Sequence, residues 1–528
     1  MHAIPDAETF NSIAQSAESP VLIPVYRRLF ADALTPVLAY RRLVSGDDRM
    51  APSFLLESVE GGDRAARYSF LGAQPEMEVI AYGSKVEVRA GGKTQGEPVT
   101  SDDPLKVVQD LSNNLPVARI EGLPDFTGGW VGHAGYDTIR YLEGDQLRTP
   151  PNDDRGLPDL HMQLYHDTVA FDHVQKCVLV ITHAESNGGV SPSALYAAAN
   201  ARLDKMVQRL TAPTINAAAD GPLSPGHIDL ASPPRVLRDS SMGEGGYQQA
   251  VLKAKAYIAA GDIFQVVPSQ RFRVETMADP FDIYRALRVI NPSPYMFYIQ
   301  IEGGVLVASS PEILCRVKDG EVVNRPLAGT RKRGRTEERD GVLEAELRSD
   351  PKDVAEHVML VDLGRNDVGR VARPGSIELP EVLIVEKYSH VMHLSSTVTG
   401  RLQDGMSCWD ALRHTLPVGT VSGAPKVRAM QIIDELEPVK RGPYAGAVGY
   451  ADLAGNMDMA IALRTMVVMP REQGGWQVDI QAGAGIVADS DPQLEHEETV
   501  NKAAALAKAV DVAEAAFVQA GGTTARAQ

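Results

Sequence analysis

The sequence predicts an α/β fold of the α+β type, in which a strand-rich N-terminal region packs with a larger region of sheets flanked by helices. Short alternating strand patterns dominate roughly the first 180 residues, and helical and strand patterns alternate beyond about residue 246. Between them, Asn, Gly, Ser, Pro and Ala become frequent, which is typical of a linker. We therefore expect an N-terminal region (1–185), a linker (186–245), a larger domain (246–512), and a helix end with a flexible tail (513–528).

The N-terminal region reads as a meandering sheet. Met77 to Tyr82 and Val86 to Arg89 alternate apolar and polar residues on either side of Gly83, which predicts two strands joined by a turn. Lys176 to Thr182 is a short apolar strand. Within the linker, Leu195 to Leu210 has the pattern of a helix.

The larger domain begins with a predicted helix from Tyr247 to Ala260 that ends at Gly261. Ile263 to Arg273 then reads as one strand. Ile313 to Val323 predicts a hairpin that turns at Asp319-Gly320, a dipeptide that readily adopts a tight turn.

Two later helices have the clearest patterns. One covers Asp353 to Leu363, and the other covers Pro492 to Gln519. The second has Asp491 as a cap, proline in its first turn and Gly521-Gly522 as its stop.

Composition excludes several classes of protein. The 528 residues carry 52 Lys plus Arg against 69 Asp plus Glu, a formal charge of −17, which argues against a nucleic-acid binder. Cys177, Cys315 and Cys408 form no CxxC pair, so neither a disulfide framework nor a structural zinc site is expected. The first residues lack the pattern of a signal peptide, and no stretch has the roughly 18 apolar residues of a membrane helix. We expect a cytoplasmic protein that binds no membrane.

Four carboxylates are candidate ligands of a divalent metal. Glu495 and Glu498 stand three residues apart on one predicted helix, and Asp353 and Glu356 repeat this spacing on another. Mg²⁺ prefers such oxygen ligands. The alternative is structural, because acids in a first turn complement the helix dipole and Glu498 can pair with Lys502.

Two glycine-containing segments resemble nucleotide loops only superficially. Gly483 to Ala488 matches the dinucleotide fingerprint, but Asp489-Ser-Asp-Pro separates it from the helix. Either it is a plain turn, or its small residues let backbone N–H groups approach a carboxylate. Gly419 to Lys426 lacks the Gly-Lys-Ser/Thr run of a phosphate loop, so nucleotide binding is not expected.

Three further features involve ionisable residues. His390 and His393 lack the third ligand of a zinc site, which leaves an acid/base role or a hydrogen-bonded structural role. The basic run Arg331 to Arg335 reads as a solvated loop. Arg464 lies in an apolar stretch, where its planar fork predicts a carboxylate partner.

Taken together, the segments resemble the chorismate-utilising enzymes and, within them, the large subunits (component I) of anthranilate synthase. The resemblance runs from residue 55 to about residue 502. It is carried by Leu55-Leu-Glu-Ser58, Asn291-Pro-Ser-Pro-Tyr-Met296, Pro326-Leu-Ala-Gly-Thr330, Ala355 to Asp367, Gly419 to Lys426 and Gln481-Ala-Gly-Ala-Gly485.

The resemblance implies a chorismate-binding catalytic domain in which ammonia adds to C2 of chorismate and pyruvate is then eliminated to give anthranilate. Glu312 would protonate the departing C4 hydroxyl, His393 would take the C2 proton, and Thr420 would line the site. Mg²⁺ would be held by Glu356 and Glu498, with Asp353 and Glu495 in support. The residues implied to hold the substrate carboxylates are Gly329, Thr330, Tyr444, Arg464, Gly483, Ala484, Gly485 and Lys502.

Two positions discriminate within the resemblance. Relatives that add water carry a Lys base where this chain has Gln265, so ammonia is the expected nucleophile. Relatives that aminate C4 have a Lys where this chain has Ala328, so direct amination at C2 is expected.

The resemblance also implies regulation and a partner. Ser58, Asn291, Pro294, Tyr295 and Met296 match the family's tryptophan pocket, which makes the N-terminal region regulatory, whereas the alternative for Asn291-Pro-Ser-Pro is a rigid turn. No glutaminase module is visible. We therefore expect a separate glutamine amidotransferase subunit (component II), in a hetero-oligomer of two large and two small subunits.

Two other functions remain open from the sequence. One is an aminodeoxyisochorismate synthase that lacks the pyruvate-eliminating step, and the other is a non-catalytic tryptophan-binding scaffold.

Overall fold

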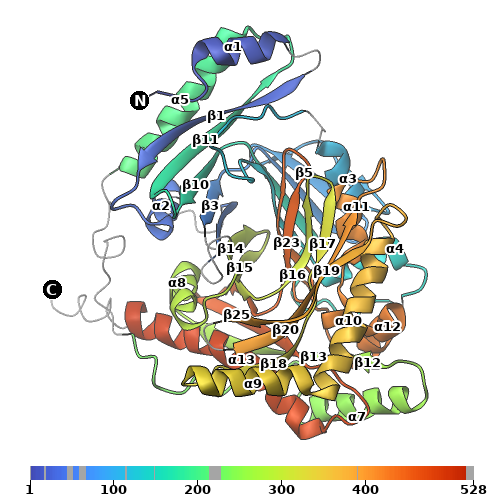
Figure 1. Cartoon of the computed structure of the whole chain (residues 1–528). Coiled ribbons are helices and arrows are strands. Elements are labelled where there is room, and N and C mark those ends of the chain that lie inside the picture. Colours follow the sequence, from blue (N-terminus) through green and yellow to red (C-terminus); the bar gives the residue numbers. More distant parts are fainter. Residues whose placement is uncertain are drawn as a thin grey trace, which may run out of the picture.

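The computed structural model describes residues 2–16, 20–44, 51–58, 67–112, 116–147, 149–212, 228–388 and 391–518. Two large antiparallel sheets form its centre, and helices cover their outer faces (Figure 1). The predicted mixture of helices and antiparallel sheets is confirmed.

The first sheet has ten strands and combines both halves of the chain. Its strands lie in the order β1 (Val21–Phe30), β11 (Cys177–Ser186), β10 (Thr168–Asp172), β3 (Tyr68–Ala73), β2 (Ser53–Glu57), β14 (Tyr295–Ile301), β15 (Gly304–Ser310), β24 (Thr465–Pro470), β25 (Trp476–Gly483) and β13 (Ser269–Thr276).

The second sheet has thirteen strands and combines both halves in the same way. Its path is β18 (Leu327–Lys332), β20 (Val391–Arg401), β17 (Glu321–Asn324), β16 (Ile313–Lys318), β23 (Met457–Ile461), β22 (Ala447–Asp452), β8 (Gly129–Ala134), β9 (Leu160–Tyr165), β4 (Met77–Tyr82), β5 (Lys85–Ala90) and β6 (Lys93–Thr94), with β19 (Glu378–Lys387) beside β20 and β7 (Val99–Thr100) beside β5. A separate two-stranded ribbon consists of β12 (Gln265–Val266) and β21 (Gly423–Ala424).

The apolar core lies in three layers. Side chains from β2 and β14, such as Phe54 and Phe297, meet Val131 and Val448 of the second sheet between the two sheets. The outer face of the ten-stranded sheet packs on α1 (Ala7–Ser16), α2 (Pro36–Leu43), α5 (Pro192–Thr211), α8 (Pro280–Ile290) and α13 (Pro492–Ala513). The outer face of the other sheet packs on α3 (Pro104–Leu111), α7 (Gly246–Ala259), α10 (Pro351–Gly369), α11 (Cys408–Thr415) and α12 (Lys426–Leu436). Two further helices are α4 (Arg140–Glu143) and α9 (Glu337–Ser349).

Both sheets cross the predicted boundary between the N-terminal region and the larger domain. β2 pairs with β14, so that Glu57 lies opposite Met296, and β8 pairs with β22. The range 186–245 contains α5. The division into four segments stays a prediction. In each sheet the strands of the N-terminal region form one side, and a single pairing, β2 with β14 or β22 with β8, joins them to the strands of the larger domain.

Several predictions of single elements are confirmed, and one is wrong. The strands around Gly83 and the hairpin at Asp319-Gly320 are confirmed as β4–β5 and β16–β17. Asp491 caps α13, because its side chain accepts from the backbone N–H groups of residues 493 and 494. Gly521-Gly522 lies outside the described residues. The single strand from Ile263 to Arg273 is wrong: Pro268, which has no N–H, separates β12 from β13 of the ten-stranded sheet.

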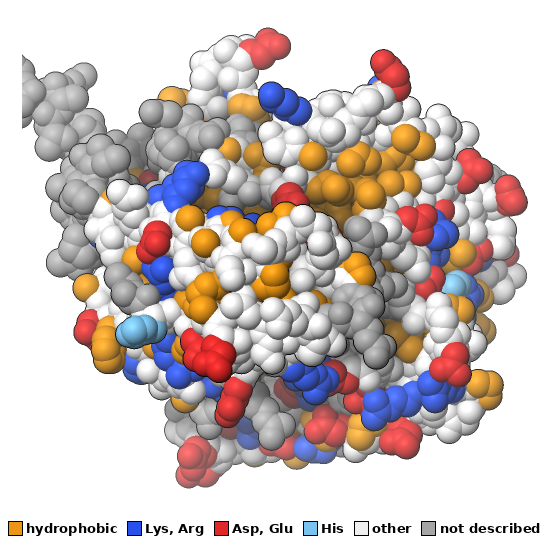
Figure 2. Space-filling view, turned by 90° about the horizontal axis from the view of Figure 1, so that it is seen from above, with side chains coloured by type: hydrophobic (Ala, Val, Ile, Leu, Met, Phe, Trp, Pro, Cys, Tyr) orange, Lys and Arg blue, Asp and Glu red, His pale blue; other side chains and the backbone are white. Residues whose placement is uncertain are grey.

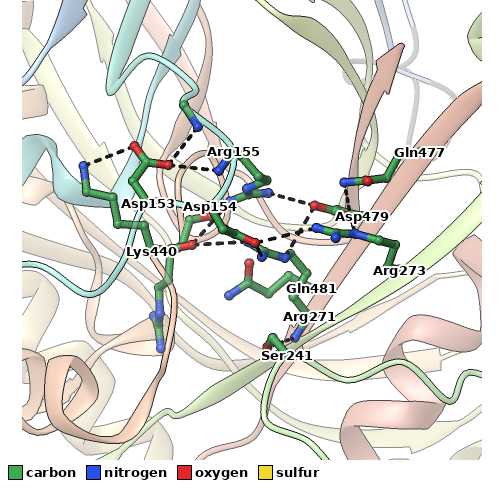
Figure 3. A network of polar contacts seen from close by, with 12 residues as sticks. Asp153, Asp154, Arg155, Ser241, Arg271, Arg273, Lys440, Gln477, Asp479 and Gln481 are labelled. Carbon is green, nitrogen blue, oxygen red and sulfur yellow. Dashed lines mark hydrogen bonds and ion pairs between the residues drawn. The ribbon is translucent and has the colours of Figure 1, made fainter. Parts of the chain in front are cut away.

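A network of charges around the buried Asp479 joins β13 and β25 to the connection that precedes β9 (Figure 3). The side chain of Asp479, on β25, lies 3.1 Å from Arg273 Nε, 3.4 Å from Arg271 Nε and 3.7 Å from Arg155 Nη1. Asp154 pairs with Arg271 and lies 3.6 Å from Arg273. We refer to these five residues as the Asp479 network.

Figure 2 shows the face of the molecule that lies at the top in Figure 1. Acidic and basic side chains are mixed on this face, and apolar side chains gather in a hollow. The excess of acidic residues therefore does not make this face uniformly negative. Across the described ranges, no helix combines the length and the apolar character needed to cross a bilayer.

Candidate active site

Glu312 lies at the start of β16 and is almost entirely buried. Thr420 Oγ1, in a 3₁₀ turn (Gly419–Val421), donates to Glu312 Oε1 at 3.0 Å, and the Leu327 N–H donates to the same carboxylate. Burial raises the pKa of Glu312 to about 8, against the opposing effects of Thr420, Leu327 and Lys502. A carboxyl group that is protonated at neutral pH can act as a general acid.

His393, on β20, is held in one tautomer. Its Nδ1 lies 3.0 Å from the Gly329 carbonyl oxygen and 3.0 Å from Thr330 Oγ1. Because a carbonyl can only accept, Nδ1 carries the proton and Nε2 is the basic nitrogen. Burial, helped by the nearby charge of Arg464, lowers the pKa of His393 and so favours the neutral ring. The ring of Tyr388 lies edge-on to it, with the centroids 5.9 Å apart.

Gln265, on β12, lies between α10 and the segment that follows β25. Its Nε2 donates to Glu356 Oε1 on α10 at 2.8 Å. A Cβ on Gly485, just beyond β25, would lie only 2.6 Å from Gln265 Nε2, so a side chain there would displace the amide. The structure therefore brings together Gln265, Glu356 and Gly485.

Gly329 brings β18 against α10. Its φ of +61° suits glycine, and an added Cβ would lie 3.1 Å from Asp353 Cβ. The backbone that supplies the carbonyl partner of His393 therefore lies directly beside Asp353.

A second group gathers at the end of β25. Lys502 Nζ donates to the Gly483 carbonyl at 3.0 Å and lies 2.7 Å from Glu498 Oε1. Tyr444 Oη lies 3.1 Å from the position that a Cβ on Gly483 would occupy, and burial raises the pKa of Tyr444 to about 12. The Ala484 N–H already donates to Tyr247 Oη at 3.2 Å, so that amide is engaged.

Arg464 lies in the turn between β23 and β24 with a φ of +45°. Its carbonyl accepts from the Ser309 N–H at 3.1 Å, three residues before Glu312. Beside burial, the charge of Arg464 lowers the pKa of His393, so the Arg464 guanidinium lies near the proposed base.

The four candidate metal ligands occur as two pairs on α10 and α13. Asp353 lies 2.9 Å from Arg331 Nη1, and Glu498 pairs with Lys502. Burial, together with the negative charge of Glu498, raises the pKa of Glu495. Within the described part of the chain, no three His, Cys, Asp or Glu side chains are gathered as an all-protein metal site requires. The oxygen donors suit a hard cation that takes one or two carboxylates and completes its shell with water and substrate.

The proposed tryptophan residues separate into two groups. Ser58, Pro294 and Tyr295 line a cavity of about 710 Å³. Met296 points to the other face of β14 and is fully buried beneath the helices, and Asn291 Nδ2 donates to Ser309 Oγ at 3.1 Å.

This cavity shares a wall with the catalytic candidates. Pro311 and Ile313, the neighbours of Glu312, line it, as do Leu327 and Tyr388. Polar groups on the wall include Arg316 and Asp458; each is within 3.0 Å of the Tyr295 hydroxyl.

Sequence reasoning missed several contacts that shape the site. No feature of the sequence indicated the hydrogen bond from the Leu327 N–H or the position of the Tyr388 ring. The buried pair Glu437–Arg441 had only a weak local indication. An acid and an arginine four residues apart can pair, but that spacing is also common on ordinary surfaces.

Comparison with known protein families defines the class of protein. The sequence profile of chorismate binding enzymes matches residues 52–508. The chain therefore belongs to the family of chorismate-binding enzymes.

Within that family, similar proteins include large subunits of anthranilate synthase. Anthranilate synthase alpha subunit 1, chloroplastic, of Arabidopsis thaliana is 50% identical over 530 residues, covering 96% of this chain and 88% of the relative. Anthranilate synthase component 1 of Acetivibrio thermocellus is 44% identical over 506 residues, covering 96% and 98%. The crystal structure of anthranilate synthase component I from Streptococcus pneumoniae superposes with a TM-score of 0.71 at 37% identity, covering 91% of this chain and 99% of that one.

Proposed function

We propose that the chain is the large subunit of an anthranilate synthase, which converts chorismate and ammonia to anthranilate and pyruvate through aminodeoxyisochorismate, the first step of tryptophan biosynthesis. The observation that carries the proposal is a buried carboxyl group, Glu312, protonated at neutral pH, in the same site as a neutral imidazole, His393. The identity to named large subunits over nearly the whole chain supports it.

The first half-reaction forms the C2–N bond. The ammonia lone pair attacks C2, both ring double bonds shift (C1=C2 to C1=C6, and C5=C6 to C4=C5), and the C4–O bond breaks. Glu312 gives its proton to the departing hydroxyl, which leaves as water. The hydrogen bond from Thr420 keeps the carboxyl in place and then stabilises the carboxylate that remains.

The second half-reaction removes pyruvate. His393 Nε2 takes the C2 proton, the electron pair restores the aromatic ring, and the C3–O bond breaks to release the enolate of pyruvate, which then takes up a proton to become pyruvate. The Nδ1 contact with Gly329 leaves Nε2 free of a proton for this step. A base here favours the complete reaction over one that stops at aminodeoxyisochorismate.

The substrate carboxylates would be held by Lys502, Arg464, Tyr444, Thr330 and the backbone of residues 329, 483 and 485. The N–H of Ala484, the remaining predicted contact, already donates to Tyr247. Glu356 and Glu498 would bind Mg²⁺, supported by Asp353 and Glu495. The cation would neutralise the ring carboxylate among these acids. Gln265 offers no basic nitrogen to activate water, and Ala328 offers no nucleophile at C4, so ammonia and C2 are favoured.

The cavity lined by Ser58 and Tyr295 would bind tryptophan as a feedback inhibitor. A separate glutamine amidotransferase subunit, component II, would supply ammonia. The two-plus-two assembly and the cytoplasmic location stay predictions; plant relatives are named as chloroplastic.

A product assay tests the proposal. The purified chain, given chorismate, ammonium and Mg²⁺, should form fluorescent anthranilate and equimolar pyruvate. Isochorismate, a para-amino product or an aminated product without pyruvate would contradict it. Binding of tryptophan without any turnover of chorismate would support a scaffold instead.

A further inference from the structure

A buried ion pair outside the proposed acid/base machinery lies beneath the site. Glu437 directly follows α12, and Arg441 comes four residues later; they are 5% and 2% exposed. Arg441 Nη2 lies 2.5 Å from Glu437 Oε1, and its Nε lies 3.0 Å from Oε2, a two-point fork. Desolvating two charges offsets most of their attraction, so such a pair contributes little net stability. Its other contacts indicate its role.

The remaining donors of Arg441 reach two turns that carry candidate site residues. Its Nη1 donates to the Val421 carbonyl at 2.8 Å, one residue after Thr420. Its Nη2 donates to the Val267 carbonyl at 2.6 Å, two residues after Gln265. Because the guanidinium is planar and rigid, these bonds fix the two turns relative to each other.

The same pair supports the end of β25. The Arg441 guanidinium lies 5.6 Å from the ring centroid of Tyr444, whose hydroxyl adjoins Gly483. Glu437 Oε1 accepts from both the N–H and the hydroxyl of Ser269, at 2.7 and 3.0 Å. The Ser269 hydroxyl in turn accepts from Gln481, two residues before Gly483.

We propose that Arg441, held by Glu437, is a positioning residue for the chorismate site: it holds Thr420 against Glu312 and Tyr444 against the backbone of Gly483. It touches no reacting atom. The inference rests on the proposed function, because it assigns Arg441 a role in that same reaction.

The test compares Arg441 with Arg140, because each of them pairs with an acidic residue on α12 or directly after it. Arg441→Lys keeps the charge but cannot reach the Val421 and Val267 carbonyls together. Arg140 pairs with Asp434 on α12 at 2.7 Å and with Asp137, three residues before it. We expect Arg441→Lys to lower kcat/KM for chorismate by at least roughly tenfold, because small misplacements of reacting groups are costly. Arg140→Lys should lower Tm yet keep kcat/KM within about twofold.

A double-mutant cycle separates positioning from a general loss of structure. If Arg441 acts through Thr420, adding Arg441→Lys to Thr420→Ala should cost clearly less than the product of the two single effects. Fully multiplicative effects, or equal losses in Arg441→Lys and Arg140→Lys, would overturn the inference. If Arg441→Lys fails to fold by circular dichroism, Glu437→Gln replaces it with the same expectations.

The wild type provides the reference for both proposals. If neither it nor Arg140→Lys makes anthranilate from chorismate, ammonium and Mg²⁺, the proposed function fails. If both do and Arg441→Lys matches them, only the positioning role fails.

Discussion

Two clusters of ionisable side chains adjoin the same strand, β25, and differ in how their charges are balanced. In the Asp479 network, three arginines converge on two carboxylates, and each acid has at least two basic neighbours. Beside Gly483, at the end of the strand, Glu498 has Lys502 as its single ion-pair partner among the described residues, and Glu495 and Glu498 repel each other. The first cluster is complete without a ligand, whereas the second retains acidic character that a cation and an anionic substrate could balance.

The difference is also visible in burial. Asp479 is 1% exposed, and burial with the neighbouring Arg271 lowers the pKa of Arg155 to about 10. The side chains of Glu498 and Lys502 are about half exposed. The network therefore resembles a piece of the core, and the acids of α13 remain accessible from solvent.

The largest expected effect comes from Glu312→Gln. Glutamine keeps the size and neutrality of the protonated side chain but cannot donate a proton to the C4 hydroxyl, so turnover should fall by roughly 10²–10⁴-fold. Anthranilate fluorescence measures the loss, and Tm should barely change. Retained turnover would remove Glu312 from the acid role.

The pH profile sharpens the same assignment. Burial raises the pKa of Glu312 to about 8, so the active, protonated form is present below that value and is lost as pH rises through it. We expect kcat/KM to decline above pH 8. Thr420→Ala removes a hydrogen bond that lowers the pKa, so its alkaline limb should move to higher pH.

A substitution within the Asp479 network should lower the stability of the folded chain. Asp479→Asn leaves two buried arginines, Arg155 and Arg271, with one fewer negative charge, which we expect to lower the free energy of unfolding by about 3–5 kcal/mol. Thermal or urea unfolding measures it, and kcat/KM for chorismate should stay within several-fold. A loss of turnover without a loss of stability would contradict the contrast between the two clusters.

The converse change is Glu498→Gln. Removing one of two repelling acids should leave Tm unchanged or raise it, while turnover falls by roughly 10²-fold because the proposed Mg²⁺ ligand is lost. Titration of activity with Mg²⁺, with a chelator control, checks it. An unchanged Mg²⁺ response with full activity would exclude Glu498 as a ligand.

The smallest effect is expected at the cavity. Ser58 Oγ is buried without a hydrogen-bond partner among the described residues, which suits a ligand that supplies one. Ser58→Ala should weaken tryptophan inhibition by about fivefold, the worth of roughly one hydrogen bond, with turnover intact. Inhibition curves at fixed chorismate decide it, and unchanged inhibition would remove Ser58 from the pocket.

The sequence predicted what local chemistry determines. The turn at Gly83, the hairpin at Asp319-Gly320 and the cap at Asp491 depend on residues that are close together along the chain. The resemblance implied that Glu312, Thr420, Gln265 and Glu356 belong to the site. The structure brings Glu312 within hydrogen-bonding distance of Thr420, and Gln265 within hydrogen-bonding distance of Glu356.

Contacts between distant segments were not predictable in the same way. Arg155 and Asp479 are more than 300 residues apart, and no periodicity links them. The resemblance places Met296 and Tyr295 in one tryptophan pocket, yet successive residues of a strand face opposite sides, so of these two only Tyr295 reaches the cavity. The break at Pro268 was hidden by apolar residues on both sides.

Both sheets combine a block of N-terminal strands with a block of strands from the larger domain, and this bears on how the chain is made. When a ribosome has released the chain only as far as β11, β2 and β8 still lack β14 and β22, which pair with them in the finished sheets. Unpaired strand edges invite association with other chains. The nascent N-terminal segment must therefore stay protected until more than 100 further residues have emerged, so slowed elongation between β11 and β14 should increase aggregation during synthesis.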